Sequence, residues 1–360
     1  MAADTVSNIT NKVRRAPSVV AFLSIGLLQG IAVSILQGIL VINWNDYLKP
    51  TVLQVPRGYT IPANFAIFIF GFLFQLIFMI DAIRLKSTAQ AMLACLLNAG
   101  FLPLAVYQRK QMKESIESLK TSTDSKGDSL VHLDKPIWQD VGGILLAMPF
   151  VVGICTIFLV ISVWYLKRHF DWEAYRSVGA DAKLRRIRTI HLYQIFVMFA
   201  KVVIYFIICF EVLYGVTQLR GIGIEFIIRM VLLGVAVVIT TLSIVFSKTE
   251  NRIGMIVSII IFLASIGYFI FNIVRIQTKW KTFGATGDIL TCYALMSAVF
   301  LFATAIFGML CLRNFYGGLK EYLQKHEEKG QRAPSVKNFE LDARNSFSYQ
   351  SVRSIRDLDS

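Results

Sequence analysis

Residues 141–166 read VGGILLAMPFVVGICTIFLVISVWYL, and this stretch decides the fold because it contains no charged side chain. At about 1.5 Å per residue, a helix of this length spans the roughly 30 Å hydrocarbon core of a bilayer. Inside that core every backbone N–H and C=O needs a partner within the protein. The stretch is therefore predicted to be a transmembrane α-helix.

Seven further apolar stretches occur along the 360-residue chain, which is 55% hydrophobic and 17% charged. Soluble domains usually carry about 25% charged residues. The third stretch is the weakest, because Asn98, Gly100 and Pro103 interrupt it. The sequence predicts an all-α, polytopic transmembrane helical bundle of about eight spans. Besides 141–166, the spans are placed at 18–42, 61–81, 88–107, 192–215, 224–246, 253–275 and 289–312.

The basic residues orient this bundle, because short cytoplasmic loops retain Lys and Arg. Eight crossings that start in the cytoplasm place 23 basic residues inside and 12 outside, whereas omitting the third crossing gives 15 and 20. Both termini are therefore predicted to be cytoplasmic, with an arm at 1–17, the bundle at 18–312 and a tail at 313–360. The tail's polar composition predicts disorder over 330–360. The sequon at Asn8 should stay unglycosylated.

The net charge of +14 does not indicate nucleic-acid binding, because the basic residues gather beside the spans. There they face the anionic lipid headgroups of the cytoplasmic leaflet. The connector 167–190 carries seven basic residues. Two interpretations stay open for it, namely topology retention and a specific site for an anionic headgroup or phosphate. The predicted partners are thus the bilayer and its headgroups.

Small residues recur every four positions along the first span, at Gly26, Gly30, Ser34 and Gly38. Such a ridge lets helix backbones approach closely in lipid. We expect intramolecular packing along it, with dimerisation as the alternative. Gln29 lies on a neighbouring face with Gln37 and is expected to hydrogen-bond to another helix, a pore-lining role being the alternative.

Ionisable side chains within spans are candidate functional sites, because charge is unfavourable in hydrocarbon. Glu211 and Arg229 fall at similar depth on consecutive antiparallel spans and are predicted to pair, as a structural clasp or as a substrate or proton site. Lys201 is shallow enough to extend its side chain to the cytoplasmic interface. Asp81 is expected at that interface, near the basic residues that follow it. The candidate intramembrane polar sites are Lys201, Glu211, Arg229, Gln29 and Asn98.

No catalytic motif is recognisable, whether a nucleophile elbow, a zinc-protease helix or a phosphate-binding loop. The four histidines are scattered, without metal-ligand spacing. The five cysteines all fall within spans, so no structural disulfide is expected. We therefore expect no enzyme and assign no catalytic, cofactor-binding or metal-binding residue.

The segment 170–181, FDWEAYRSVGAD, reads as an interfacial element. Its aromatic residues suit the headgroup region. Gly179 is placed to end a short helix and Asp181 to cap the next one. The alternative interpretation is a docking surface for a lipid or a protein partner. The candidate cytoplasmic docking surface comprises Trp172, Tyr175, Arg176, Asp181, Arg185 and Arg186.

In the tail, Tyr349 and Val352 form a Tyr-x-x-apolar motif of the kind that vesicle-coat adaptors bind in an extended peptide. Four-residue matches are frequent by chance. The motif is therefore a hypothesis for a sorting signal, with coat adaptors as its partners.

Four segments together resemble a fungal family of multi-pass Golgi apparatus membrane proteins of unassigned biochemical function. They are 81–90 (DAIRLKSTAQ), 170–181, 268–276 (YFIFNIVRI) and 314–320 (NFYGGLK). The likeness covers roughly residues 20–325. It implies an endomembrane location, most specifically the Golgi apparatus, and supplies no activity or substrate.

The sequence thus favours a non-enzymatic endomembrane protein for membrane organisation, sorting or trafficking. The alternative is a small-solute or ion transporter or channel, which a hydrated cavity near the midplane would favour. A dry, fully packed bundle would favour the first interpretation.

Overall fold

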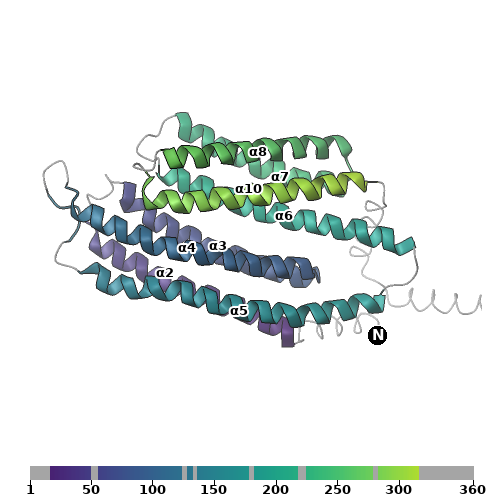
Figure 1. Ribbon diagram of the computed structural model, residues 1–360, viewed down its shortest axis with the longest axis horizontal. Coiled ribbons are helices and arrows are strands. Elements are labelled where there is room, and N and C mark those ends of the chain that lie inside the picture. The colour runs from purple at the N-terminus through teal and green to yellow at the C-terminus, as the bar shows by residue number, and fades with distance from the viewer. Residues whose placement is uncertain are drawn as a thin grey trace, which may run out of the picture.

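The structure is a computed structural model that describes residues 17–49, 56–123, 128–132, 136–177, 182–217, 224–278 and 283–315. Within these residues eight helices are long and apolar enough to cross a membrane, and they lie side by side along the molecule's long axis (Figure 1). They are α2 (Pro17–Tyr47), α3 (Pro56–Arg84), α4 (Thr88–Lys120), α5 (Ile137–Ser177), α6 (Ala182–Thr217), α7 (Ile224–Lys248), α8 (Arg252–Thr278) and α10 (Ala285–Arg313).

Each predicted span lies within one of these helices, so the prediction of an all-α bundle with eight spans is confirmed. The third stretch is one continuous helix, α4, which the Ser87 hydroxyl caps by accepting from the backbone N–H of Gln90 at 3.3 Å. Pro103 lies inside α4 and does not end it. Packed neighbours can satisfy the backbone group that a proline frees in a membrane helix.

Helices extend into two of the connectors between the predicted spans. The third predicted span ends at residue 107, and the segment after it was expected to be a loop of about 33 residues. This expectation is wrong in its first part, because α4 continues to Lys120. The connector at 167–190 is also mostly helical, because α5 runs to Ser177 and α6 begins at Ala182. At 41 residues α5 is about 60 Å long, twice the hydrocarbon core. α5 and α6 therefore both extend well beyond the same membrane surface.

The bundle consists of two halves of four helices each, with the same order of neighbours. In the N-terminal half, α2 and α4 each pack against α3 and α5. In the C-terminal half, α6 and α8 each pack against α7 and α10. Figure 1 shows the first group below the second. Because each half has an even number of spans, both halves enter the membrane from the same side.

The halves meet where α3 packs against α6 and where α4 packs against α10. Aromatic rings fill this interface. Tyr205 of α6 stacks on Phe74 of α3, with ring centroids 4.6 Å apart and planes 10° apart, and meets Phe101 of α4 edge-on at 6.5 Å. Gly71 makes this approach possible, since a Cβ there would lie 2.6 Å from the Tyr205 hydroxyl and 2.8 Å from Phe101.

The ridge of small residues on α2 faces α3 over its first part. A Cβ added at Gly26 would lie 2.7 Å from the Met79 side chain, and one at Gly30 would lie 4.0 Å from the Phe72 Cβ. At Gly38 it would meet no atom within 4 Å, and Ser34 is half-buried. Close intramolecular packing therefore occurs at the start of the ridge, and dimerisation through its remainder stays a prediction.

Candidate functional site

Two of the predicted polar residues, Gln29 and Asn98, form one cluster in the N-terminal half. Gln29 of α2 donates from Nε2 to Asn98 Oδ1 of α4 at 2.9 Å. Asn98 donates in turn to the Thr156 hydroxyl of α5 at 2.8 Å. Gln37 of α2 also bonds to α4, because it donates to Gln108 at 3.0 Å. The prediction that Gln29 and Gln37 hydrogen-bond to another helix is therefore confirmed.

Further along α4, Gln111 connects both halves by accepting from Asn64 of α3 and donating to Thr286 of α10, each at 2.9 Å. Polar side chains that bond across helices in this way hold membrane bundles together, at about 0.6 kcal/mol on average for each bond. The polar face of α4 therefore has a structural explanation.

Lys201 and Asp81 form a contact that the sequence did not predict. Lys201 Nζ of α6 lies 2.5 Å from Asp81 Oδ2 of α3, and the same oxygen accepts from Gln90 of α4 at 2.9 Å. The expectation that Lys201 extends towards the interface agrees with this contact, because Asp81 was expected at that interface, and the structure adds the ion pair between them. The pair joins the two halves at the end where α2, α4, α6 and α8 begin, which is the predicted cytoplasmic end.

A second ion pair joins the halves at the opposite, predicted lumenal end. Lys110 Nζ of α4 lies 2.7 Å from Asp288 Oδ2 of α10. The Lys110 side chain is 49% exposed, so this pair contributes about 1 kcal/mol or less. The interface between the halves thus has an ion pair at each end and aromatic packing between them.

The predicted pair of Glu211 and Arg229 is present, with Glu211 Oε2 of α6 and Arg229 Nη1 of α7 3.7 Å apart. Both residues are almost completely buried, at 3% and 7% exposure. Two residues of α8 complete the cluster. Arg229 donates to the Tyr268 hydroxyl at 2.9 Å and to Asn272 Oδ1 at 3.2 Å.

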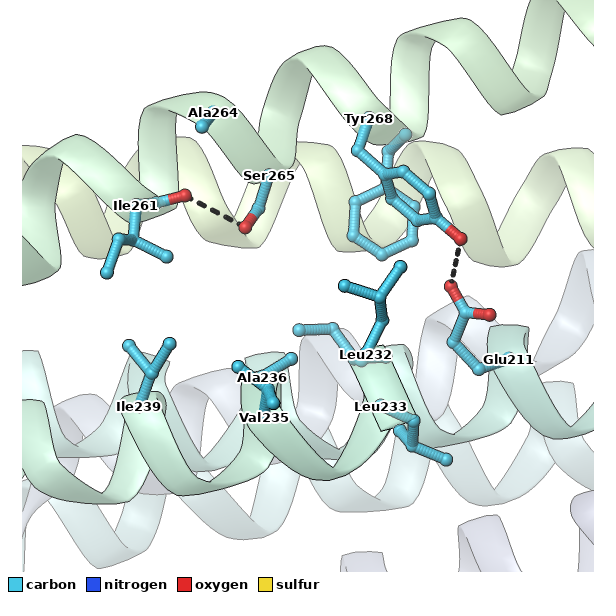
Figure 2. Close-up of a pocket in the computed structure, with 12 residues that line it drawn as sticks. Glu211, Leu232, Leu233, Val235, Ala236, Ile239, Ile261, Ala264, Ser265 and Tyr268 are labelled. Carbon is cyan, nitrogen blue, oxygen red and sulfur yellow. Dashed lines mark hydrogen bonds between the residues drawn. The ribbon is translucent and has the colours of Figure 1, made fainter. Parts of the chain in front are cut away.

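Tyr268 connects the two charges, because its hydroxyl also donates to Glu211 Oε1 at 2.8 Å (Figure 2). The Arg229 guanidinium lies 3.9 Å from the centre of the Tyr214 ring. Such a position over an aromatic face stabilises a cation by roughly 0.5–2 kcal/mol. The carboxylate and the guanidinium are thus neutralised locally, on three helices of the C-terminal half.

A cleft of about 270 Å³ lies between α7 and α8 and ends at this cluster. Its walls are mainly aliphatic, with Leu232 and Ile239 on α7 and Ile261 on α8. Figure 2 shows Glu211 and Tyr268 together at one end of the space between the two helices. This cleft could not be predicted from the sequence, because it depends on how α7 and α8 pack.

The structure does not bring the predicted polar residues into one path. Gln29 and Asn98 lie among α2, α4 and α5, Lys201 binds α3, and Glu211 and Arg229 lie among α6, α7 and α8. On the described part of the chain these are three separate clusters, each with its own partners.

The candidate docking surface lies largely outside the residues whose side chains the structure describes. The backbone of Trp172, Tyr175 and Arg176 is helical, within α5, and Arg185 and Arg186 lie within α6. The expected short helix is the last part of α5, which continues without a break to Ser177, and the next helix, α6, begins at Ala182. Asp181, Tyr349 and Val352 lie outside the described residues, and their roles stay predictions.

Comparisons with known proteins give one clear relative. No family model and no solved structure matches the chain. A UPF0658 Golgi apparatus membrane protein of Schizosaccharomyces pombe is 24% identical over 278 residues, which cover 73% of this chain and 78% of the relative. The chain is thus a multi-pass membrane protein similar to this uncharacterised family of Golgi membrane proteins, as the segments at 81–90, 170–181, 268–276 and 314–320 indicated.

Proposed function

We propose that this protein has a non-enzymatic role in the Golgi apparatus or a related endomembrane, where it organises or sorts membrane components. The location is supported by the relative, whose name describes a Golgi apparatus membrane protein. The role is supported by the architecture, which joins two four-helix halves into one packed body.

One set of observations carries the proposal, namely the two ion pairs and the aromatic packing at the interface between the halves. Asp81–Lys201 joins them at one end and Lys110–Asp288 at the other. Between these pairs the Tyr205 ring packs against α3 and α4. A solute path through this interface would need polar side chains that converge near its midplane. Aromatic rings lie there instead. A packed body of this kind suits a protein that acts through its surfaces.

Those surfaces lie on the predicted cytoplasmic side. The end of α5 and the start of α6 extend beyond the bilayer there, and the segment 167–190 carries seven basic residues. Basic residues next to a membrane attract anionic lipid headgroups, at about 1 kcal/mol each. The tail adds the motif of Tyr349 and Val352, which we propose as a signal for coat adaptors.

The tail is tested by following the tagged protein in a fungal host. Deleting residues 330–360, or the single change Tyr349→Ala, is expected to move the protein away from the Golgi. Gln350→Ala is the matched control, because adaptors bind the first and fourth side chains of the motif and not the second. A truncated protein that still reaches the same compartment would rule out sorting through the tail.

A transporter is the second candidate, and the pairing of the halves favours it. Two halves with the same helix order and an ion pair at each end of their interface resemble an arrangement that could open alternately at either face. In that case Lys201→Met or Glu211→Gln should abolish solute flux, measured by solute profiling of variant strains. For an organising protein, Lys201→Met should keep both the solute profile and the location unchanged.

A further inference from the structure

The cleft between α7 and α8 is long enough to hold the rigid part of one lipid molecule. Its walls cover residues 232–239 of α7 and 261–269 of α8. At about 1.5 Å per residue these segments are roughly 10 and 12 Å long. Leu232 and Val235 at its edge are each 46% exposed, so the cleft opens sideways towards the surrounding lipid.

The middle of the cleft is apolar and lined by small side chains. Ala236 of α7 and Ala264 and Ser265 of α8 face this space, as Figure 2 shows. The Ser265 hydroxyl donates to the Ile261 carbonyl of its own helix at 2.8 Å, so it needs no bond from an occupant. Small residues on both helices leave room for a flat apolar surface to make close contact.

The polar end of the cleft has more acceptor capacity than donor capacity. Glu211 Oε1 accepts from Tyr268, whereas Glu211 Oε2 is fully buried and lies 3.7 Å from Arg229 Nη1, so Oε1 is the carboxylate oxygen available to an occupant. A carboxylate has about four lone-pair positions, and a phenolic oxygen accepts as well as donates. Arg229, which donates to Tyr268 and to Asn272, is not among the residues that line the cleft. An occupant that donates a hydrogen bond therefore fits this end.

The depth of the cleft matches one leaflet of the membrane. Arg229 lies five residues after the start of α7, about 8 Å along the helix. From there the cleft extends towards the middle of α7 and α8. An occupant would place its polar group near the predicted lumenal interface and its hydrocarbon towards the bilayer centre. A phospholipid fits poorly, because its phosphate would approach the buried Glu211 carboxylate.

We propose that this cleft binds a membrane sterol, whose hydroxyl donates a hydrogen bond to Glu211 or Tyr268. The fused rings are rigid and flat, so they lose little conformational entropy on binding. Diacylglycerol and ceramide also carry a hydroxyl, but their flexible chains would have to be ordered in the cleft. The proposal is independent of the sorting role, because it concerns ligand binding by the full chain.

The test uses the purified full-length protein in phosphatidylcholine vesicles with a photoreactive sterol that keeps its hydroxyl. Crosslinked peptides are expected from α7 and α8, and unlabelled sterol should compete. A sterol whose hydroxyl is converted to a methyl ether cannot donate, and should compete about tenfold less well, as the loss of one hydrogen bond predicts. Equal competition by the ether, or labelling spread over all eight helices, would overturn the proposal.

Matched variants locate the site. Ala236→Phe fills the cleft and should abolish labelling of α7 and α8. The control Gly234→Phe adds the same ring on α7, where a Cβ would meet nothing within 4 Å, and should leave the labelling unchanged. Tyr268→Phe should lower competition by sterol severalfold. Labelling of Ala236→Phe at the wild-type level, or better competition by diacylglycerol or ceramide than by sterol, would refute a sterol site. Because labelling is read on purified protein, this result is separate from that of the localisation experiment.

Discussion

Replacing Arg229 by methionine removes the cation from an ion pair that is almost fully buried. The Arg229 and Glu211 side chains are 9% and 4% exposed. The substitution deletes the hydrogen bonds to Tyr268 and Asn272 and leaves Glu211 with Tyr268 as its remaining hydrogen-bond partner among the described residues. Removing one member of a buried pair destabilises a protein by about 3–5 kcal/mol. We expect Arg229→Met to lie in this range.

The double variant Glu211→Gln/Arg229→Met separates the unpaired charge from the loss of packing. Without a buried charge it should recover about 2 kcal/mol relative to Arg229→Met, a coupling within the range of contacting residues. Arg168→Met is the control, because Arg168 is exposed on α5 and surface changes usually stay within about 0.5 kcal/mol.

The three buried thiols of Cys95, Cys209 and Cys311 supply the assay. A thiol-reactive fluorophore reports their exposure when the detergent-solubilised protein is heated. A single variant that unfolds at the wild-type temperature would refute the reasoning. A double variant no more stable than the single one would show that an unpaired Glu211 charge is not the cause.

Three further predictions use the same thermal assay. Gly71→Ala should lower the unfolding temperature strongly, because its Cβ would lie 2.6 Å from the Tyr205 hydroxyl. The control Gly143→Ala should be neutral or stabilising, since a Cβ there meets nothing within 4 Å. Equal effects of the two variants would contradict the close approach of the halves. Asn98→Leu should destabilise the protein by about 1 kcal/mol, because the hydrogen bonds to Gln29 and Thr156 are lost. The control Leu96→Ala, at a 57% exposed position, should have little effect. A larger loss of stability in Leu96→Ala than in Asn98→Leu would count against the polar cluster. Asp81→Asn and Lys201→Met should each destabilise the protein by about 1 kcal/mol, and the double variant should lose less stability than the sum of the two. Additive effects of the two substitutions would mean that the ion pair does not form in the membrane.

The sequence predicted the spans because unbroken apolar stretches leave few alternatives to a membrane helix. It also predicted the pairing of Glu211 with Arg229, since consecutive spans are antiparallel and depth can be counted along each. The end of α4 was missed because residues 108–120 are polar, and polarity was interpreted as a loop. Their buried members, Gln108 and Gln111, bond to neighbouring helices instead.

Contacts between distant spans could not be predicted. Asp81 and Lys201 lie 120 residues apart, and their pairing requires α3 to pack beside α6, which no periodicity in one sequence reveals. Tyr268 and Asn272 were overlooked as members of the Arg229 cluster for the same reason. A polar residue at the depth of a buried charge on a further span is the signal that could have indicated them.

Glycosylation mapping tests the central claim most directly, namely that eight crossings arranged as two four-helix halves leave both chain ends in the cytoplasm. A glycosylation acceptor with a flexible linker is inserted between residues 124 and 127, in the connection between α4 and α5, and compared with the natural sequon at Asn8. The account predicts sugar at the inserted site and none at Asn8. Sugar at Asn8, or an inserted site that stays unmodified, would contradict it.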